Sequence, residues 1–321
     1  MKCIIQANKF KSVLCNLSRI GEWWVLSLGL IFFAFIPYIY RINNSITIEN
    51  LTDLFTSSPL YFALIVVFAV QVFGFASNDY FDRHVDALDD TKRFRNSICT
   101  GRVTAKEVWA LLIVTAIISL MTSLVFGFFA FLFTVFALFI FYFYSAEPLR
   151  FKNKIGLDVL SHGIFINTFP YFFCLIALWD FSIGNVFLLI ILIMRSSIAQ
   201  LLQEIRDYDV DKKVERNTVV ALGQKRTVWI VFVIYLAIFF STLILLVSYQ
   251  LFNVGISLFY LVILFLCITY APVFYKLLTT VDYGEIIERL WMGQGRTNRW
   301  MGIRYAGSFS LYFYIVFFLL I

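Results

Sequence analysis

Charge is scarce in this sequence. Of its 321 residues, 14% are Asp, Glu, Lys or Arg, whereas 61% are hydrophobic. A soluble globular domain carries about 25% charged residues, so water is excluded as the main solvent of this protein. Glycine and proline, with 15 and 5 residues, are also too few to interrupt many of the apolar runs. The composition therefore indicates a membrane protein.

The 5 cysteines and 2 histidines form no metal-binding or disulfide pattern. The cysteines are scattered, with no CxxC pair and no histidine at ligand spacing, which gives no support for a zinc site or a disulfide framework. The first 22 residues are basic but lack a small-residue cleavage site after a short apolar segment. We therefore expect the first apolar run to be a true membrane span and not part of a cleaved signal peptide.

Apolar runs long enough to cross a bilayer follow one another along the chain. A transmembrane helix needs about 20 residues at about 1.5 Å of rise per residue. Nine runs meet this length, near residues 23–41, 59–77, 107–125, 127–145, 158–179, 183–203, 227–249, 252–276 and 305–321. The sequence predicts an all-α integral membrane protein of nine transmembrane helices. We expect one domain over residues 1–321, of which residues 1–22 are an N-terminal arm.

The positive charges fall on alternate connections between these runs. Of the 26 Lys and Arg residues, 24 lie in the N-terminal arm and in the polar segments 78–106, 150–154, 204–226 and 276–304. Because Lys and Arg in short loops mark the cytoplasmic side, we expect the N-terminus and these segments to be cytoplasmic. The net charge of +6 is then a topology signal and an attraction to anionic membrane lipid, and it gives no evidence for nucleic-acid binding.

Two acidic clusters lie at the predicted cytoplasmic ends of the second and sixth spans. Both have a spacing of three and then four residues: Asp79, Asp82 and Asp86 in the first, and Glu204, Asp207 and Asp211 in the second. On a helix this spacing places the carboxylates on one face, where they repel one another unless a cation lies between them. Because Mg²⁺ binds carboxylates together with substrate phosphates, two such faces opposing each other would suit a diphosphate. The alternative is a pair of solvated acidic loop ends.

These motifs resemble those of the UbiA superfamily of intramembrane prenyltransferases. The first cluster, from Asn78 to Asp86, matches the NDxxDxxxD motif of that family residue for residue. The second, from Asp207 to Asp211, matches its DxxxD motif, and Glu204 stands at the position of an additional upstream acid.

A third segment strengthens the resemblance. Residues 144–152 are similar to the YSxxPxRxK segment of the family, and they are closest to the branch that includes chlorophyll synthases and carotenoid elongases. The resemblance implies a UbiA-type helical bundle with a polar cap on the cytoplasmic side. It also implies a multi-pass protein of a cell membrane, which we expect to be the inner membrane of a prokaryote.

The resemblance further implies the reaction, which is Mg²⁺-dependent ionisation of a polyprenyl diphosphate and transfer of the prenyl group to a lipophilic acceptor. The implied metal ligands are Asn78, Asp79, Asp82, Asp86, Glu204, Asp207 and Asp211. The implied catalytic residues are Asp79, Asp82, Asp207, Asp211 and Tyr144. The implied contacts to the donor are Arg93, Arg95, Arg150, Lys152 and Arg195.

Some of these residues also have simpler interpretations. Lys and Arg belong in cytoplasmic loops for topology alone, and most of the 38 Phe and 17 Tyr residues must face lipid or pack between helices. Tyr144 and Tyr208 are the aromatic candidates for stabilising an allylic cation. Arg195 is an intramembrane charge that either faces the substrate or the acidic cluster, or pairs with backbone carbonyls or Asn167.

Three other functions compete with this one. A secondary transporter would place acids near the bilayer midplane and interrupt helices in both halves of the chain. A membrane phosphatidyltransferase would carry a DGxxAR signature, which this sequence lacks. A UbiA-like protein that cyclises its isoprenoid, or that uses water or another prenyl chain as the acceptor, is not distinguished from a transferase by the sequence.

Overall fold

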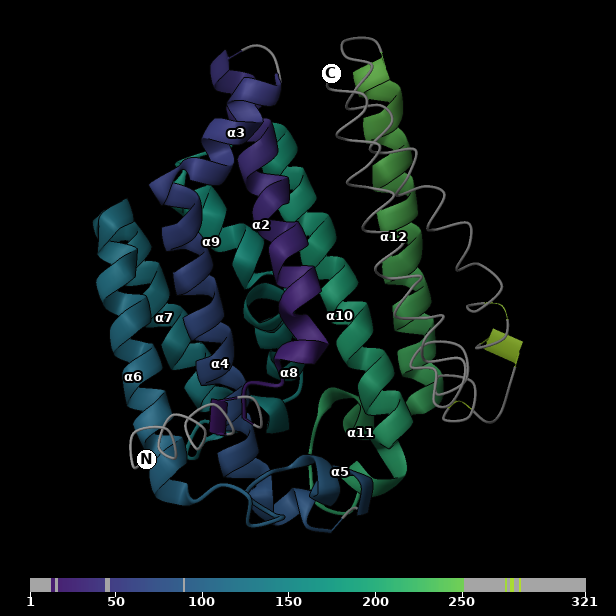
Figure 1. The fold of residues 1–321 in the computed structure, drawn as a ribbon. Coiled ribbons are helices and arrows are strands. Elements are labelled where there is room, and N and C mark those ends of the chain that lie inside the picture. Colours follow the sequence, from purple (N-terminus) through teal and green to yellow (C-terminus); the bar gives the residue numbers. More distant parts are fainter. Residues whose placement is uncertain are drawn as a thin grey trace, which may run out of the picture. The chain divides into compact units, whose positions relative to one another are not determined.

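Helices account for all the regular structure within the residues that the computed structural model describes, which are 13–14, 17–43, 47–88, 90–250, 275, 278, 279 and 283. The long helices are α2 (Ile20–Asn43), α4 (Ser58–Asp86), α6 (Ala105–Ser123), α7 (Phe128–Ser145), α10 (Ile183–Asp211) and α12 (Gln224–Gln250) (Figure 1). The short ones are α3 (Ile48–Thr56), α5 (Asp90–Arg95), α8 (Leu157–Ser161), α9 (Phe169–Ala177) and α11 (Thr218–Leu222). The prediction of an all-helical fold is confirmed for this part of the chain.

Five of the described helices are long and apolar enough to cross a membrane: Ser58–Asp86, Ala105–Phe126, Phe128–Ser145, Ile183–Asp211 and Gln224–Ser241. They coincide with five of the expected spans. The expected first span lies in α2, which has 24 residues. The expected spans 252–276 and 305–321 lie outside the described residues, so the total of nine remains a prediction.

The expected span over 158–179 is bent. Its two parts, Leu157–Ile166 and Phe169–Ala177, meet at 54° and count as a sixth span if they cross the membrane together. The first part ends in a π-helical turn, η3 (His162–Ile166), and Pro170 stands in the first turn of α9. A proline fits the first turn of a helix but cannot continue the helix before it, which explains a break at this point.

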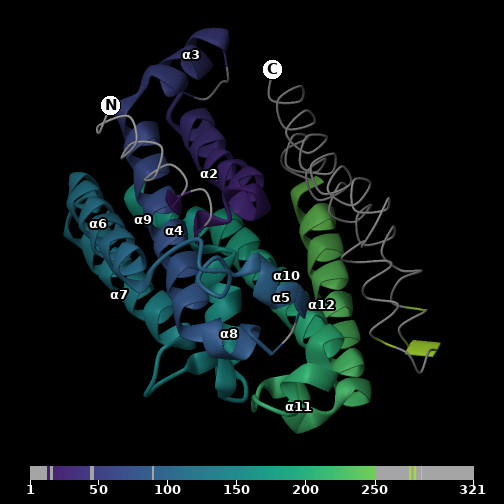
Figure 2. The same ribbon diagram turned by 60° about the horizontal axis from the view of Figure 1, so that its bottom comes forward.

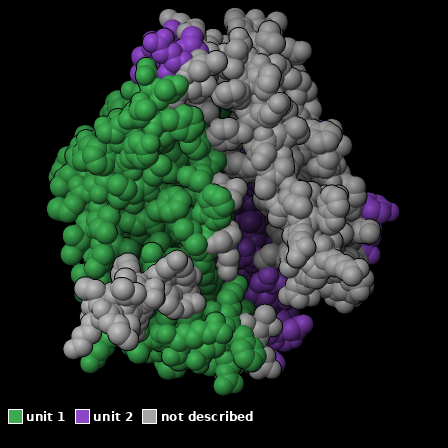
Figure 3. Space-filling view, in the orientation of Figure 1, with its two compact units in different colours: residues 1–38, 52–189 green, residues 39–51, 190–321 purple. Residues whose placement is uncertain are grey.

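The chain divides into two compact units, which Figure 3 distinguishes by colour. Unit 1 comprises residues 1–38 and 52–189, and unit 2 comprises residues 39–51 and 190–321. In unit 1, α4 packs against α6 and α7, and α9 packs against α4 and α7. Figures 1 and 2 show α6 and α7 running beside each other. In unit 2, α11 packs against α12.

Local sequence signals explain where α6 and α7 begin. The hydroxyl oxygen of Thr104 accepts a hydrogen bond from the Glu107 amide (3.4 Å), and the Glu107 carboxylate accepts one from the Thr104 amide (2.9 Å). This reciprocal capping box satisfies two amides at the start of α6. Gly127 precedes α7 with φ of 96°, a conformation that glycine adopts without strain. The two helices are thereby joined by a short turn and pack together.

A second glycine allows α4 and α7 to approach closely. A Cβ atom on Gly74 would lie 2.2 Å from Cδ1 of Phe141, far inside van der Waals contact. Phe141 is buried, and its ring meets that of Phe169 edge-on with the centroids 6.1 Å apart. This packing fixes how α4 and α7 lie against each other at Gly74 and Phe141.

We expect Gly74→Ala to destabilise the protein, because the Phe141 ring must move within a packed interior. The expected cost is about 1–3 kcal/mol, as for other overpacked cores. Thermal unfolding of the detergent-purified protein measures it. The double variant Gly74→Ala/Phe141→Leu removes the clash and should regain much of the loss. A single variant that unfolds at the wild-type temperature would contradict the close approach of the two helices.

Candidate functional site

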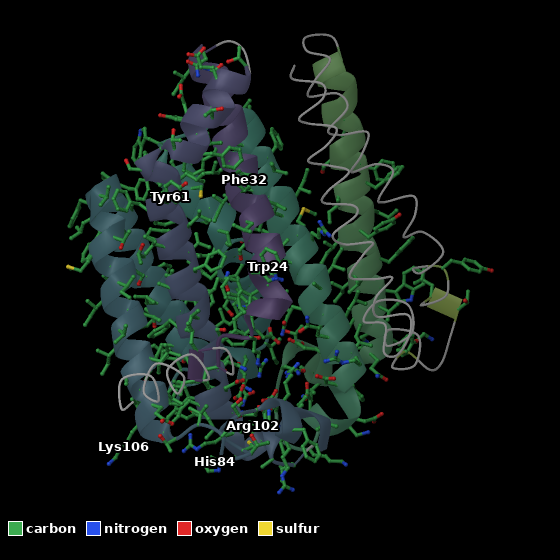
Figure 4. The ribbon with its side chains drawn as sticks, viewed as in Figure 1. Trp24, Phe32, Tyr61, His84, Arg102 and Lys106 are labelled. Atoms are coloured by element: carbon green, nitrogen blue, oxygen red, sulfur yellow. The ribbon has the colours of Figure 1, made fainter. Side chains whose placement is uncertain are left out.

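Ionisable groups gather at the end of unit 1 where α4 ends. In Figure 4, His84, Arg102 and Lys106 lie at this end, whereas Phe32 and Tyr61 lie toward the other. All three ionisable side chains are exposed. Exposed basic residues such as Arg102 and Lys106 are what a cytoplasmic end would carry, and the orientation in the membrane remains a prediction.

Three carboxylates lie on the last turns of α4. Asp79, Asp82 and Asp86 belong to one uninterrupted helix, and their exposed fractions are 0%, 4% and 8%. Their spacing therefore places them on one face, as the sequence predicts. A buried carboxylate is costly unless cations or hydrogen-bond donors compensate it, and each of the three has such a partner.

Asp82 is held by the segment that follows α7. Its Oδ1 atom lies 2.6 Å from Nζ of Lys152 and 3.4 Å from Nη2 of Arg150. The hydroxyl of Ser145 donates a hydrogen bond to Oδ1 of Asn78 (2.8 Å) and lies 3.4 Å from Oδ2 of Asp82. The structure therefore brings the segment 144–152 against the first acidic motif.

The backbone of Arg150 is strained. Its φ of 34° and ψ of 65° lie in the left-handed region, which a residue with a side chain seldom adopts. The guanidinium donates to the carbonyl of Ser145 (3.2 Å) in addition to its contact with Asp82. Strain of this kind persists where the surroundings hold a residue in place, and it is frequent at functional sites.

Asp79 is paired with Arg19, which lies just before α2. Both side chains are buried, at 8% and 0% exposure, and Arg19 has φ of 44°. The guanidinium carbon lies 5.9 Å from the ring centroid of Phe75, and the indole of Trp23 donates to the carbonyl of Ser18 (2.6 Å). Oδ2 of Asp79 is buried and has no hydrogen-bond partner among the described residues. Half of this carboxylate is therefore available to a further ligand.

Asp86 is held by Asn96, a fully buried residue that follows α5. The Asn96 amide nitrogen lies 2.8 Å from both Oδ2 of Asp86 and the carbonyl oxygen of Asp79. Its Oδ1 atom accepts from the backbone amide of Ile98 (3.0 Å). One side chain thus fixes the loop after α5 to the first motif.

Cys99 lies in the same loop but is a poor nucleophile. Its thiol donates to the carbonyl of Arg83 (3.0 Å). Burial raises the pKa of this thiol above its ordinary value, and the nearby Asp86 carboxylate raises it further. Because the thiolate is the reactive form, Cys99 is unsuited to covalent catalysis at neutral pH.

The second motif lies on α10 in unit 2, where amide donors hold two of its acids. Oε1 of Glu204 accepts from the Gln200 amide (2.7 Å), and Oε2 accepts from the backbone amide of Val219 in α11 (3.4 Å). Oδ2 of Asp211 accepts from the side chain of Asn217 (3.0 Å), which also caps α11. These bonds connect the end of α10 to α11.

The third acid of this motif, Asp207, is gripped by its neighbour Arg206. Nε of Arg206 donates to Oδ1 (2.7 Å) and Nη2 donates to Oδ2 (3.0 Å), a two-pronged pair. The side chains are 23% and 21% exposed. Asp207 thus has both of its oxygens in contact with a cation on the same helix.

The structure places the remaining expected residues as follows. Tyr144 lies at the end of α7, and its ring centroid is 6.5 Å from that of His162. Arg93 and Arg95 are exposed on α5. Arg195 is half-buried on α10. Of the expected contacts to the donor, Arg150 and Lys152 form ion pairs with the motif aspartate Asp82.

Within the part of the chain that the structure describes, no three His, Cys, Asp or Glu side chains are grouped as a ready metal site. The acids are instead held by the basic and amide partners described above. A cation that bound several of these acids would have to replace some of these contacts.

The profile of the UbiA prenyltransferase family matches residues 50–285, a range that includes both acidic motifs and the segment 144–152. The chain belongs to this family. No curated protein matches the sequence well enough to count as a relative.

Solved UbiA structures have the same fold. A UbiA homologue from Archaeoglobus fulgidus, bound to GPP and Mg²⁺, has a TM-score of 0.64 and 19% identity over 95% of this chain and 99% of that chain. The apo UbiA homologue from Aeropyrum pernix K1 has a TM-score of 0.63 and 17% identity over 91% and 96%. A structure described for digeranylgeranylglyceryl phosphate synthase has a TM-score of 0.61 and 17% identity over 98% and 97%. At these identities the likeness shows the UbiA fold alone.

Several residues around the UbiA motifs are not among those expected from the sequence. Arg19 and Asn96 contact Asp79 and Asp86 from positions that no motif links to them. Ser145, by contrast, lies inside the segment 144–152 that resembles the family motif. Its position in this segment was therefore a signal that it lies near the site. Arg206 directly precedes the DxxxD motif; its position was visible in the sequence, but its two-pronged contact was not.

Proposed function

We propose that this UbiA protein is an intramembrane prenyltransferase, which ionises a polyprenyl diphosphate and transfers the prenyl group to a lipophilic acceptor. The observation that carries the proposal is the α4 cluster, in which three buried carboxylates lie on one helix face with Arg150 and Lys152 at Asp82. Carboxylates suit a hard divalent cation, and basic side chains suit phosphate. Unit 1 therefore offers groups for both parts of a magnesium diphosphate.

The residues fit Mg²⁺ as the cofactor. The proposed ligands are all oxygen donors, which Mg²⁺ prefers: Asn78, Asp79, Asp82, Asp86, Glu204, Asp207 and Asp211. The unpartnered Oδ2 atom of Asp79 is a buried acceptor that a cation would satisfy. When bound, Mg²⁺ neutralises the negative charge that develops on the departing diphosphate. The Archaeoglobus fulgidus homologue, which has this fold, is bound to GPP and Mg²⁺.

The basic side chains would hold the diphosphate during ionisation. Arg150 and Lys152 exchange part of their contact with Asp82 for phosphate oxygens, and the guanidinium can hold two of these at once. Arg93 and Arg95 add positive charge from α5, and Arg195 contacts the donor or the acceptor from α10. The ring of Tyr144 stabilises the allylic cation. The segment 144–152 favours an acceptor of the chlorophyll synthase and carotenoid elongase branch, and the site faces the cytoplasm.

A secondary transporter is less well supported. It would need interrupted spans in both halves and acids near the middle of the spans. The described residues contain one bent pair, Leu157–Ile166 with Phe169–Ala177, and the α4 acids lie at the end of their helix. This arrangement favours chemistry at one membrane face.

Release of pyrophosphate tests the proposal. Detergent-purified protein is given geranylgeranyl diphosphate and a membrane lipid extract, first with Mg²⁺ and then with EDTA. We expect release with Mg²⁺ and none with EDTA, because the leaving group then lacks its counter-charge. Mass spectrometry of the extract identifies the acceptor, and a free prenyl alcohol or a cyclic product would instead indicate water or intramolecular attack. No release from folded protein with any allylic donor of about ten to fifty carbons would refute the proposal.

A further inference from the structure

The pair between Arg206 and Asp207 differs from the other contacts of the two acidic motifs. It joins consecutive residues on α10, with Nε and Nη2 of the arginine bonded to both carboxylate oxygens at 2.7 Å and 3.0 Å. Consecutive side chains leave a helix about 100° apart and do not naturally face each other. The two side chains must therefore bend toward each other along the helix surface.

Asp207 is also the most exposed of the motif acids. Its side chain is 21% exposed, whereas Asp79, Asp82 and Asp86 have exposed fractions of 0%, 4% and 8%. Glu204 and Asp211, at 5% and 6%, are buried on the same helix as Asp207. A hydrated cation that approaches the α10 motif from water can therefore reach Asp207 more readily than the acids beside it.

Metal binding at Asp207 and the grip of Arg206 compete. A guanidinium that donates to both oxygens occupies one lone pair on each of them, and the two positive charges repel at this distance. Mg²⁺ binding at Asp207 is therefore favoured when the guanidinium gives up at least one of its two hydrogen bonds. Holding two long side chains in one geometry costs conformational entropy, and the pair is partly exposed to water. The guanidinium can therefore be exchanged for another cation, because ion pairs in contact with water contribute little free energy.

We propose that Arg206 is a positioning residue of the α10 motif: it holds Asp207 as a resident counter-ion, which Mg²⁺ displaces. The inference rests on the proposed function, because it takes Asp207 to be a metal ligand. Arg206 thereby keeps the Asp207 carboxylate oriented and compensated, and it sets the Mg²⁺ concentration at which the α10 motif fills. Removal of its guanidinium strengthens metal binding, whereas removal of an ordinary supporting residue would weaken it.

Metal affinity without substrate tests this directly. Mn²⁺ replaces Mg²⁺ in titrations of the detergent-purified full chain, and electron paramagnetic resonance measures the free ion. We expect Arg206→Gln to lower the dissociation constant of the α10 site about tenfold, since it removes a charge-assisted competitor. Arg206→Lys keeps the charge but loses the two-pronged grip, and it should give a smaller decrease. Asp207→Asn identifies which bound Mn²⁺ belongs to the α10 site.

Lys212→Gln is the matched control. It removes the same charge directly after α10 and breaks the ion pair of Lys212 with Asp209 (2.5 Å). Asp209 stands at a variable position of the DxxxD motif, and its side chain is 82% exposed. If loss of positive charge alone raised Mn²⁺ affinity, this variant would match Arg206→Gln. We expect it to change the affinity less than about twofold, because exposed pairs contribute little.

The outcomes separate the inference from the proposed function. Unchanged or weaker Mn²⁺ binding in Arg206→Gln, with wild-type binding that Asp207→Asn abolishes, overturns the role of Arg206 and leaves the metal site standing. The same holds if Lys212→Gln strengthens binding as much as Arg206→Gln. Wild-type protein that binds no Mn²⁺ overturns both. If Arg206→Gln does not purify as a single species, the Arg206→Lys titration decides in the same way.

Discussion

Asp82→Asn should reduce turnover by at least about a thousandfold, because it removes a proposed metal ligand and with it the proposed counter-charge for the leaving diphosphate. Asp82 holds Lys152 and Arg150 at 2.6 Å and 3.4 Å, and it lies 3.4 Å from the Ser145 hydroxyl that contacts Asn78. The neutral amide keeps the shape of the side chain but neither its charge nor its second acceptor oxygen. Pyrophosphate release at saturating donor and Mg²⁺ measures the loss.

Asp209→Asn is the control for this prediction. It also removes one acid from a UbiA motif, but Asp209 stands at a variable position of DxxxD, and its side chain is 82% exposed and paired with Lys212. We expect turnover within about twofold of wild type, as for other exposed pairs. Size-exclusion chromatography shows whether each variant purifies as a single folded species. Normal turnover in folded Asp82→Asn would remove the metal role of this residue, and an equal loss in Asp209→Asn would point to a general effect of charge.

Local features of this chain could be predicted from the sequence. The placement of Asp79, Asp82 and Asp86 on one helix face follows from their spacing alone, because a helix repeats every 3.6 residues. Apolar runs likewise located α4, α6, α7 and α10. The capping box at Thr104 and the glycine at 127 fix helix ends through contacts within a few residues, where sequence is most informative.

Contacts between distant segments could not be predicted in the same way. Arg19 meets Asp79 across 60 residues, and no periodicity relates an N-terminal arginine to a motif in the second span. The side chain of Asn96 fits between two parts of the α4 cluster because the loop after α5 folds back. Pro170 is a local signal for a break in the helix before it. Hydropathy, however, indicates only the length of the apolar run and not the angle between its two parts.

Arg19→Gln should lower the stability of the protein strongly. The substitution leaves Asp79, a carboxylate with 0% exposure, without its cation. Breaking a buried ion pair by removing one partner typically costs about 3–5 kcal/mol, because an uncompensated charge stays buried. Thermal unfolding in detergent with EDTA present measures the change. Arg102→Gln, which removes an exposed arginine of the same unit, should unfold close to the wild-type temperature.

The double variant Arg19→Gln/Asp79→Asn separates stability from function. Both charges are removed, so no uncompensated carboxylate remains and most of the lost stability should return. Turnover should not return, because Asp79 is a proposed metal ligand with an unpartnered oxygen for the cation. If the double variant unfolded as early as Arg19→Gln, the buried charge would not be the cause of the instability. If it were stable and active, Asp79 would be a structural partner of Arg19, and the metal would be held by the other acids of the α4 cluster.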